Sequence, residues 1–203
     1  MTSRRVAALV LAALLPTTAL PAAPASAGVT TVRSFSIADP VPDVMFGAAD
    51  ADGTRRIEVE LKRTEWSHLR LRHEDRLRVR ARIQQARKTD AAYRQGLVVE
   101  AWRSPERKPP RLVAYAVVFD LSSGVRAVRP DGAVTRCPRA RRTRNLAKGI
   151  LSVTMPAACL RLRGRVKLVA VTYLDSYGPA GWGRAASDRS VLSKALRYPR
   201  RLR

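Results

Sequence analysis

Few residues in this chain could perform acid–base or nucleophilic chemistry. It has two histidines, His68 and His73, and two cysteines, Cys137 and Cys159. The histidines are five positions apart, so an extended strand would place them on opposite faces. The sequence contains no G-x-S-x-G, H-E-x-x-H, G-x-G-x-x-G or P-loop pattern. We therefore expect a non-enzymatic protein. A hydrolase stays open as an alternative, because the members of a Ser–His–Asp site need not be close in sequence.

The carboxylates do not form a recognisable catalytic or metal-binding pattern either. Glu58 and Glu60 are i, i+2 neighbours that share one strand face, whereas glycosidase carboxylates flank a sugar. Asp50-Ala51-Asp52-Gly53 resembles the start of a calcium loop. However, the sixth position is Arg55, and the twelfth is Leu61 where a bidentate Glu should stand. Two cysteines and two distant histidines also lack metal-ligand spacing. We expect no metal and no cofactor.

The cysteine pair is expected to form a disulfide between Cys137 and Cys159. An even number of cysteines in an exported chain is typical of such a bond. Closing a loop of about 20 residues would stabilise the fold by roughly 3 kcal/mol. Two free buried thiols are the alternative.

Aromatic side chains gather near the glycine-rich stretch 178–183. Tyr173, Tyr177 and Trp182 lie within ten positions of one another. Exposed aromatics on a loop stack on sugar rings, so a carbohydrate-binding module that uses Tyr177 and Trp182 is an alternative function. The other interpretation is that these rings fill the core beneath a loop.

Positive charge is the strongest compositional feature. The chain has 39 Lys and Arg against 16 Asp and Glu, a net charge of +23. Such a charge attracts polyanions at long range. Aromatics are not interleaved with the basic residues, so sequence-specific nucleic-acid binding is not expected. The alternative is a solvated surface shaped by codon usage. The candidate polyanion-binding residues are Arg70, Arg72, Arg76, Arg78, Arg80, Arg82, Arg139, Arg141, Arg142 and Arg144.

The N-terminus has the pattern of a cleavable secretory signal, residues 1–27. Arg4 and Arg5 precede ten apolar residues, 6–15, too few to span a bilayer, and Ala25-Ser26-Ala27 is a cleavage site before Gly28. Cleavage leaves 37 basic and 16 acidic residues, a net charge of +21. No later apolar stretch is long enough for a transmembrane anchor. We expect a secreted protein, extracellular or associated with the cell wall, of unknown oligomeric state.

Alternation of apolar and polar residues predicts β-strands through the middle of the chain. We expect an extended lead-in over 28–48 and one all-β domain over 49–183, an antiparallel β-sandwich or jelly roll. A short helix over 187–196 and a basic C-terminal tail follow within 184–203, and the arginine-rich segment 136–148 is expected to be a loop. The expected strands cover 57–61, 69–71, 77–83, 97–102, 112–119, 150–155 and 166–173.

One hairpin register can be argued from the side chains. A three-residue loop over 73–75 would pair Leu71 with Leu77 and Leu69 with Val79 on the core side. The other face would then pair Arg72 with Arg76 and Arg70 with Arg78. Like charges directly opposite cost up to about 1 kcal/mol per pair. Either neighbouring carboxylates or an external anion must relieve this ladder, and neutralisation by the protein's own carboxylates would remove the case for a polyanion.

Five short motifs are considered together: the Asp50–Gly53 turn, the basic hairpin with its His73-Glu-Asp-Arg76 turn, Val117-Val-Phe-Asp120, Cys137, and Val153-Thr-Met-Pro-Ala-Ala-Cys159-Leu160 followed by the strand Val166-Lys-Leu-Val-Ala-Val. Together they resemble a family of small secreted β-sandwich proteins of high-GC Gram-positive bacteria. The resemblance covers about Asp50 to Asp188, and this chain has fewer acidic loop residues than the family. Because that family has no assigned activity, the resemblance implies the fold and export but no mechanism.

Overall fold

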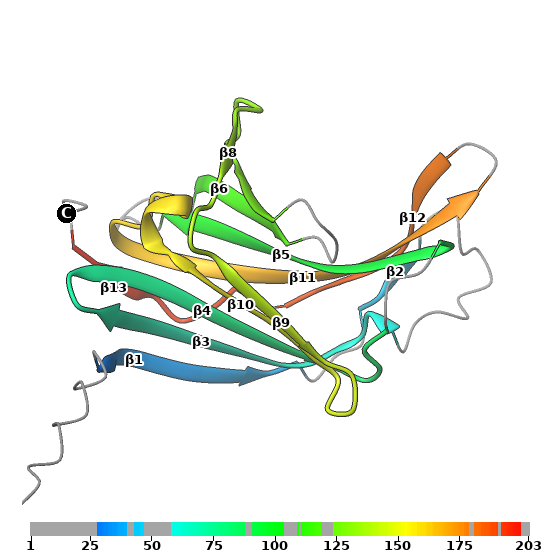
Figure 1. Ribbon diagram of the computed structural model, residues 1–203, viewed down its shortest axis with the longest axis horizontal. Helices are drawn as coiled ribbons and strands as arrows, with labels where there is room; N and C mark the ends of the chain where they lie inside the picture. Colours follow the sequence, from blue (N-terminus) through cyan, green and yellow to red (C-terminus); the bar gives the residue numbers. More distant parts are fainter. Residues whose placement is uncertain are drawn as a thin grey trace, which may run out of the picture.

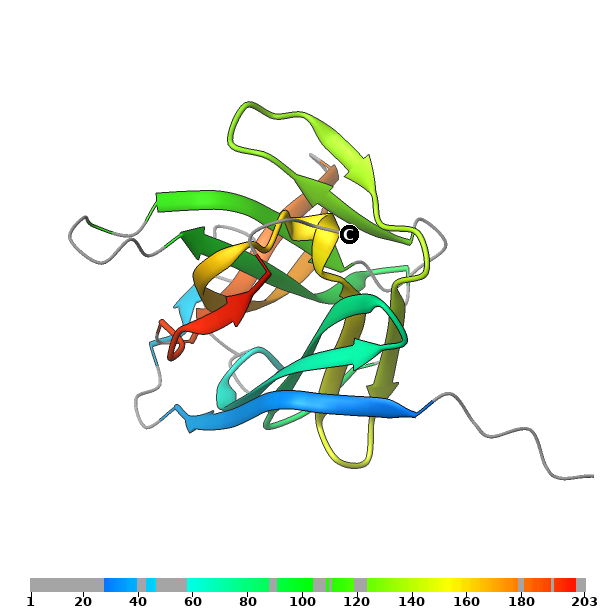
Figure 2. The same cartoon turned by 90° about the vertical axis from the view of Figure 1, so that its left-hand side faces the viewer.

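Two antiparallel β-sheets pack against each other as the two layers of this protein (Figure 1). The computed structural model describes residues 28–39, 43–46, 58–87, 91–103, 109, 111–118, 124–178, 181–190 and 192–199, with the backbone alone for 178, 181 and 182. The predicted signal, the Asp50–Gly53 turn and the last four residues therefore lie outside the described residues. Figure 2 shows the two layers from one end.

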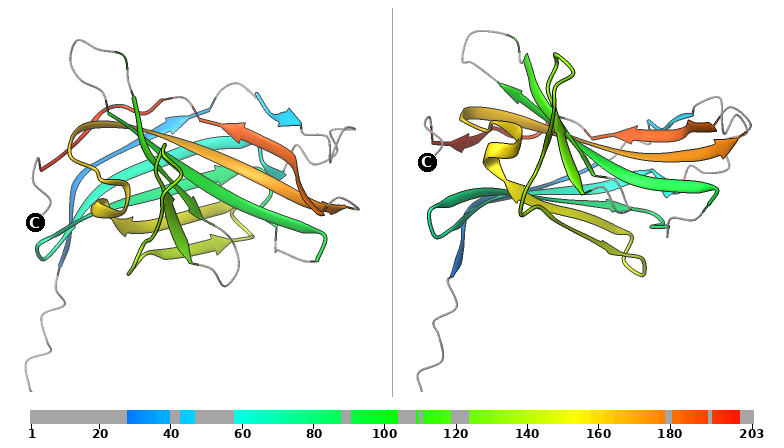
Figure 3. Two further views of the ribbon diagram at one scale, coloured as in Figure 1. Left: turned by 90° about the horizontal axis from the view of Figure 1, so that it is seen from above. Right: turned by 45° about the horizontal axis from the view of Figure 1, so that its top comes forward.

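The first sheet has five strands. Their order is β1 (Val29–Ala38), β3 (Leu61–Leu71), β4 (Glu74–Ile83), β10 (Ile150–Pro156) and β9 (Arg141–Asn145). The strands β1 and β9 form its two opposite edges (Figure 3, left).

The second sheet has eight strands. Seven follow in the order β2 (Met45–Phe46), β12 (Gly181–Arg189), β11 (Gly164–Gly178), β5 (Tyr93–Arg103), β6 (Arg111–Val118), β7 (Val125–Val128) and β8 (Val134–Arg136). The eighth, β13 (Leu196–Tyr198), pairs with the start of β11. A short 3₁₀ helix, η3 (Ala157–Leu160), follows β10.

The core forms where the apolar sides of the two sheets meet. On β4, Leu77, Val79 and Ala81 are fully buried, while the arginines between them face the other way. Trp66 of β3 pairs with Val79 and is also fully buried. Burying one such aliphatic or aromatic side chain contributes about 1.5–3 kcal/mol. The predicted all-β sandwich is therefore confirmed, and strands form over most of the expected ranges.

The predicted β3–β4 register is wrong. Leu71 pairs with Glu74, and the hairpin turns at Arg72 and His73, where Arg72 has a left-handed φ of 54°. The core side of β3 carries Thr64, Trp66 and His68, because its phase is set by the large Trp66 ring and not by the two leucines. In this register Glu65 lies opposite Arg80, so no continuous arginine ladder forms.

Three other local expectations are also corrected. The segment 187–196 is not a helix, since its first residues continue β12 and Ser190 and Ser193 bond to β11 through both backbone and hydroxyl groups. Segment 136–148 is not all loop, because β9 pairs with β10 there. Strand β3 begins at Leu61, and Glu58–Glu60 before it are not extended. In each case tertiary pairing decided the conformation.

Candidate functional site

The outer side of the five-stranded sheet is lined by arginines and hydroxyl groups. Side chains alternate along a strand, and paired residues share a face. The outward arginines of β4 therefore stand beside Thr154 and Ser152 of β10, and beside Arg63 and Ser67 of β3. At the edge, β9 adds Arg141 and Thr143. We call this surface the basic face. It consists of Arg63, Arg78, Arg80, Arg82, Arg141, Ser67, Thr143, Ser152 and Thr154.

Most of the arginines on the basic face have no carboxylate partner. Arg80 Nη1 lies 2.9 Å from Glu65 Oε2. Among the described residues, no carboxylate oxygen lies within ion-pair distance of Arg63, Arg78, Arg82 or Arg141. Arg63 stands directly opposite Arg82, and like charges in that position are unfavourable. The face thus keeps an uncompensated positive charge.

The basic face is hollowed between β4 and β9. A depression of about 480 Å³ is lined by Arg78, Arg80, Thr143, Ser152 and Thr154, together with Arg144, Asn145, Lys148 and Ile150. Guanidinium and hydroxyl groups are donors suited to anionic oxygens. The structure therefore places donors and positive charge around one shallow concavity.

Several predicted polyanion-binding arginines are neutralised inside the protein. Arg70 donates to Asp75 Oδ1, with Nη2 at 3.2 Å. Arg76 is buried, and its Nε lies 3.3 Å from Glu74 Oε2. Arg139 reaches the other oxygen of Glu74 at 2.7 Å. These three side chains are therefore engaged by the protein's own carboxylates.

The remaining predicted arginines are divided among three locations. Arg72 is exposed in the β3–β4 turn. Arg78, Arg80, Arg82 and Arg141 belong to the basic face. Arg142 and Arg144 pair with Val153 and Leu151, so they lie on the inner side of β9. The ten predicted residues thus do not form a single surface.

The two histidines have different surroundings, because one is buried and the other is exposed. His68 is buried; its Nε2 is 2.8 Å from Asp75 Oδ1, and its ring centroid is 4.3 Å from that of Tyr198. Burial raises the pKa of Tyr198. His73 is exposed in the hairpin turn. Among the described residues no serine or cysteine hydrogen-bonds to either ring. The His68–Asp75 contact joins β3 to β4, and the His68–Tyr198 ring contact joins β3 to β13.

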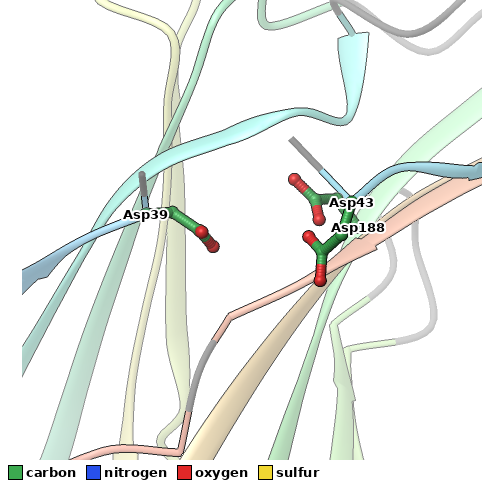
Figure 4. Close-up of side chains that lie close together, drawn as sticks. All are labelled: Asp39, Asp43 and Asp188. Carbon is green, nitrogen blue, oxygen red and sulfur yellow. The ribbon is translucent and has the colours of Figure 1, made fainter. Parts of the chain in front are cut away.

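Three aspartates that are distant in sequence meet at one end of the sandwich (Figure 4). Asp39 follows β1, Asp43 precedes β2 and Asp188 lies in β12, and one carboxylate oxygen from each lies within 4.8 Å of the other two. Hard cations such as calcium prefer oxygen ligands, although calcium takes six to eight of them. The sequence contains no pattern that links these three positions, because only the folding of β1 against β3 and of β2 against β12 brings them together.

Asp188 is the buried member of this cluster. Its Oδ2 accepts a hydrogen bond from Leu61 N at 2.6 Å, and its Oδ1 accepts one from Arg189 N at 2.8 Å. Burial raises the pKa of Asp188 to about 7, and a hydrogen bond with Asp43 acts in the same direction. Asp188 therefore binds a proton more readily than an exposed aspartate does.

The predicted disulfide is not present, because Cys137 and Cys159 are both free and are not at disulfide distance. Their thiols nevertheless lie together, with Cys137 buried after β8 and Cys159 half-buried in η3. The hydrogen bond between them lowers the pKa of Cys137 and raises that of Cys159, which burial raises further. The expectation from cysteine number was thus right about proximity and wrong about the bond.

The aromatic cluster is divided between core and surface. Tyr173 is buried, and the guanidinium of Arg184 lies 4.3 Å from its ring centroid. Tyr177 is 60% exposed near the end of the β11–β12 hairpin and pairs with Trp182 in the backbone register. The Trp182 side chain lies outside the described residues.

No protein-family model matches this chain, and no curated protein matches it significantly. Within the described residues, no helix is long and apolar enough to cross a membrane.

Proposed function

We propose that this protein is secreted and, without catalysing a reaction, binds an anionic polymer of the cell surface through its basic face. The observation that carries the proposal is a sheet surface on which Arg63, Arg78, Arg82 and Arg141 have no carboxylate partner among the described residues. A polymer with repeated anionic groups would neutralise several of them at once. It would also relieve the repulsion between Arg63 and Arg82.

The spacing of the arginines suits an extended chain of charges. Residues two apart on a strand are separated by roughly 6.6 Å, so Arg78 and Arg82 span about 13 Å along β4. Arg141 lies two strands away from Arg78, which is roughly 10 Å across the sheet. The hydroxyl groups of Ser152 and Thr154 lie between these two strands. A polymer that crosses the depression would meet charges and donors alternately.

Binding of polyphosphate to the purified protein tests the proposal. With four phosphate contacts, and the slope per contact of a single-stranded polyanion, a fourfold rise in salt should weaken binding about 50-fold. The triple variant R78Q/R82Q/R141Q should lose roughly 100-fold in affinity at low salt, taking about 1 kcal/mol per exposed ion pair. Neutral dextran should not bind.

A variant of equal charge serves as the control. Arg163, Arg165 and Arg197 are exposed and belong to the other sheet or the turn before it. The triple variant R163Q/R165Q/R197Q lowers the net charge by the same three units and should retain most of the affinity. Equal losses in the two triple variants, or retention that does not depend on salt, would contradict a site on the basic face.

The export proposal has its own test. Expression in a secreting bacterial host should give a mature protein that begins at Gly28, as measured by intact mass. A purified product whose mass still includes residues 1–27 would contradict export through a cleaved signal.

A carbohydrate-binding function rests on one observation, the exposed ring of Tyr177 beside the backbone of Trp182. Exposed aromatic side chains bind sugars by stacking on the apolar face of the sugar ring. The variants Tyr177→Ala and Trp182→Ala should then each abolish retention on a neutral glycan without changing the affinity for polyphosphate. Unchanged retention in both would exclude this function.

A further inference from the structure

The edge strand β9 carries arginines on its inner side as well as on the basic face. Arg142 pairs with Val153 and Arg144 with Leu151, and both of these partners belong to the core. An inner-facing position on a sandwich strand is normally apolar, because the space between the sheets is dry. Two adjacent inward arginines are therefore exceptional and require a physical reason.

A cavity lies at this edge between the two sheets. Its volume is about 160 Å³, and its apolar lining comes from Leu97, Val118 and Leu151. The polar part of the lining consists of Gln95, Arg142, Thr143, Arg144 and Ser152. No carboxylate from the described residues lines it. The cavity thus combines an apolar wall with a positively charged one.

The two arginines of the cavity have different surroundings. Arg144 is held by the backbone, since its Nη2 donates to the carbonyl oxygen of Gln95 at 2.7 Å and its Nη1 donates to that of Arg87. Arg142 is half-buried and lines the cavity, and among the described residues no carboxylate lies within ion-pair distance of it. Its Nη1 atom, which is closed off from solvent, has no hydrogen-bond partner there either. A guanidinium that is partly withdrawn from water without a counter-charge is unfavourable, so Arg142 is the group that a bound anion would satisfy.

We propose that this cavity binds a small monocarboxylate with an apolar tail. The carboxylate pairs with Arg142, because a planar guanidinium fork matches a carboxylate in geometry and a single open guanidinium requires a single charge. The tail lies among Leu97, Val118 and Leu151. A cavity of about 150 Å³ accommodates one benzene ring, so the tail has about six carbon atoms.

The cavity adjoins the basic face, since Thr143, Arg144 and Ser152 line both the cavity and the depression. Arg142 and Arg141 are sequence neighbours, but they point to opposite sides of β9. The basic face is proposed to bind repeated charges on a polymer, and Ile150 is the one aliphatic residue in the lining of its depression. The cavity has three aliphatic lining residues and takes a tail as well as one charge. The two ligand classes can therefore be distinguished by their chemistry and by their variants.

The test is a titration of the folded protein with hexanoate, followed by methyl and backbone NMR shifts. Hexanoate should shift the methyl signals of Leu97, Val118 and Leu151. Hexanol and inorganic phosphate should bind at least tenfold more weakly, because each supplies only one half of the ligand. The variant Arg142→Gln should weaken hexanoate binding about 10- to 100-fold, the effect of losing a hydrogen bond to a charged group. Arg141→Gln is the matched control and should leave it unchanged.

Several outcomes would overturn the assignment. Hexanoate shifts confined to the basic face, or equal losses in Arg142→Gln and Arg141→Gln, would place the ligand outside the cavity. Hexanol binding as tightly as hexanoate would remove the role of Arg142. Hexyl phosphate binding more tightly than hexanoate would exclude the monocarboxylate. If Arg142→Gln does not fold, the absence of methyl shifts in the unaltered protein decides against the site.

Discussion

Raising the pH from 5 to 7 should destabilise this protein, because the folded state keeps a proton on Asp188 that the unfolded chain releases. Burial raises the pKa of Asp188 to about 7, and the contact with Asp43 adds to the shift. An unfolded aspartate titrates near 3.9. Between these two values the folded state holds a proton that the unfolded chain has released. The stabilisation is therefore complete below about pH 4 and is lost as the pH rises through 7.

The size of the effect follows from the proton count. One extra proton in the folded state makes the free energy of unfolding fall by about 1.4 kcal/mol per pH unit. Between pH 5 and 7 the upper limit is about 3 kcal/mol, a large part of the stability of a typical domain. Above pH 7 the contribution from Asp188 should no longer change.

Urea unfolding at fixed ionic strength, followed by tryptophan fluorescence, measures this effect. Trp66 is fully buried and reports on the opening of the core. In the variant Asp43→Asn the pH slope should become shallower but not vanish, because burial is the larger cause of the shift. Asp131→Asn, at an exposed aspartate in the β7–β8 turn, is the control and should keep the full slope.

The comparison of variants is needed because burial also raises the pKa of Asp175. That carboxyl contributes to the slope with the same sign but does not belong to the cluster. A free energy of unfolding that is constant or rises from pH 5 to 7 would refute the reasoning. Equal slopes in Asp43→Asn and Asp131→Asn would assign the effect to another group.

Two further predictions concern the basic face and the second sheet. Glu65→Gln removes the carboxylate that pairs with Arg80. It should raise polyphosphate affinity about fivefold, because one more available guanidinium contributes roughly 1 kcal/mol. An unchanged affinity in a binding titration would argue that Arg80 does not contact the polymer. Gly96→Ala should lower the free energy of unfolding by about 1–3 kcal/mol in urea denaturation, because a Cβ would lie 2.3 Å from the ring of the buried Tyr173. A variant as stable as the unaltered protein would show that the ring can move aside.

Much of the fold could be predicted from local sequence. Alternation over residues 77–83 placed Leu77, Val79 and Ala81 in the core and the arginines of β4 outside, as the structure has them. The register of β3 could not be predicted in the same way. Either Leu69 or His68 could face the core, since the two are neighbours in the strand. The pairing of Trp66 with Val79, which is a contact between two strands, decides which of them does.

The candidate sites were predictable only in part. Arg78, Arg80 and Arg82 were recognised as a surface row, and Arg141 was recognised as basic. The inward direction of Arg142 could not be predicted, because it depends on β9 pairing with β10 in the observed register. The Asp39–Asp43–Asp188 cluster likewise has no sequence pattern. A short sequence motif cannot include Asp43 and Asp188, because they are about 145 positions apart in the chain.

The amino-acid sequence by itself determined the strands and the excess of arginine, because alternation and charge are local properties of a chain. Tertiary structure alone decided which of the described arginines lack a carboxylate partner, which of them face the cavity, and which aspartate is buried beside a second carboxyl group. Those outcomes depend on pairing between segments that are distant in the chain, and such pairing is set by the packing of the whole core.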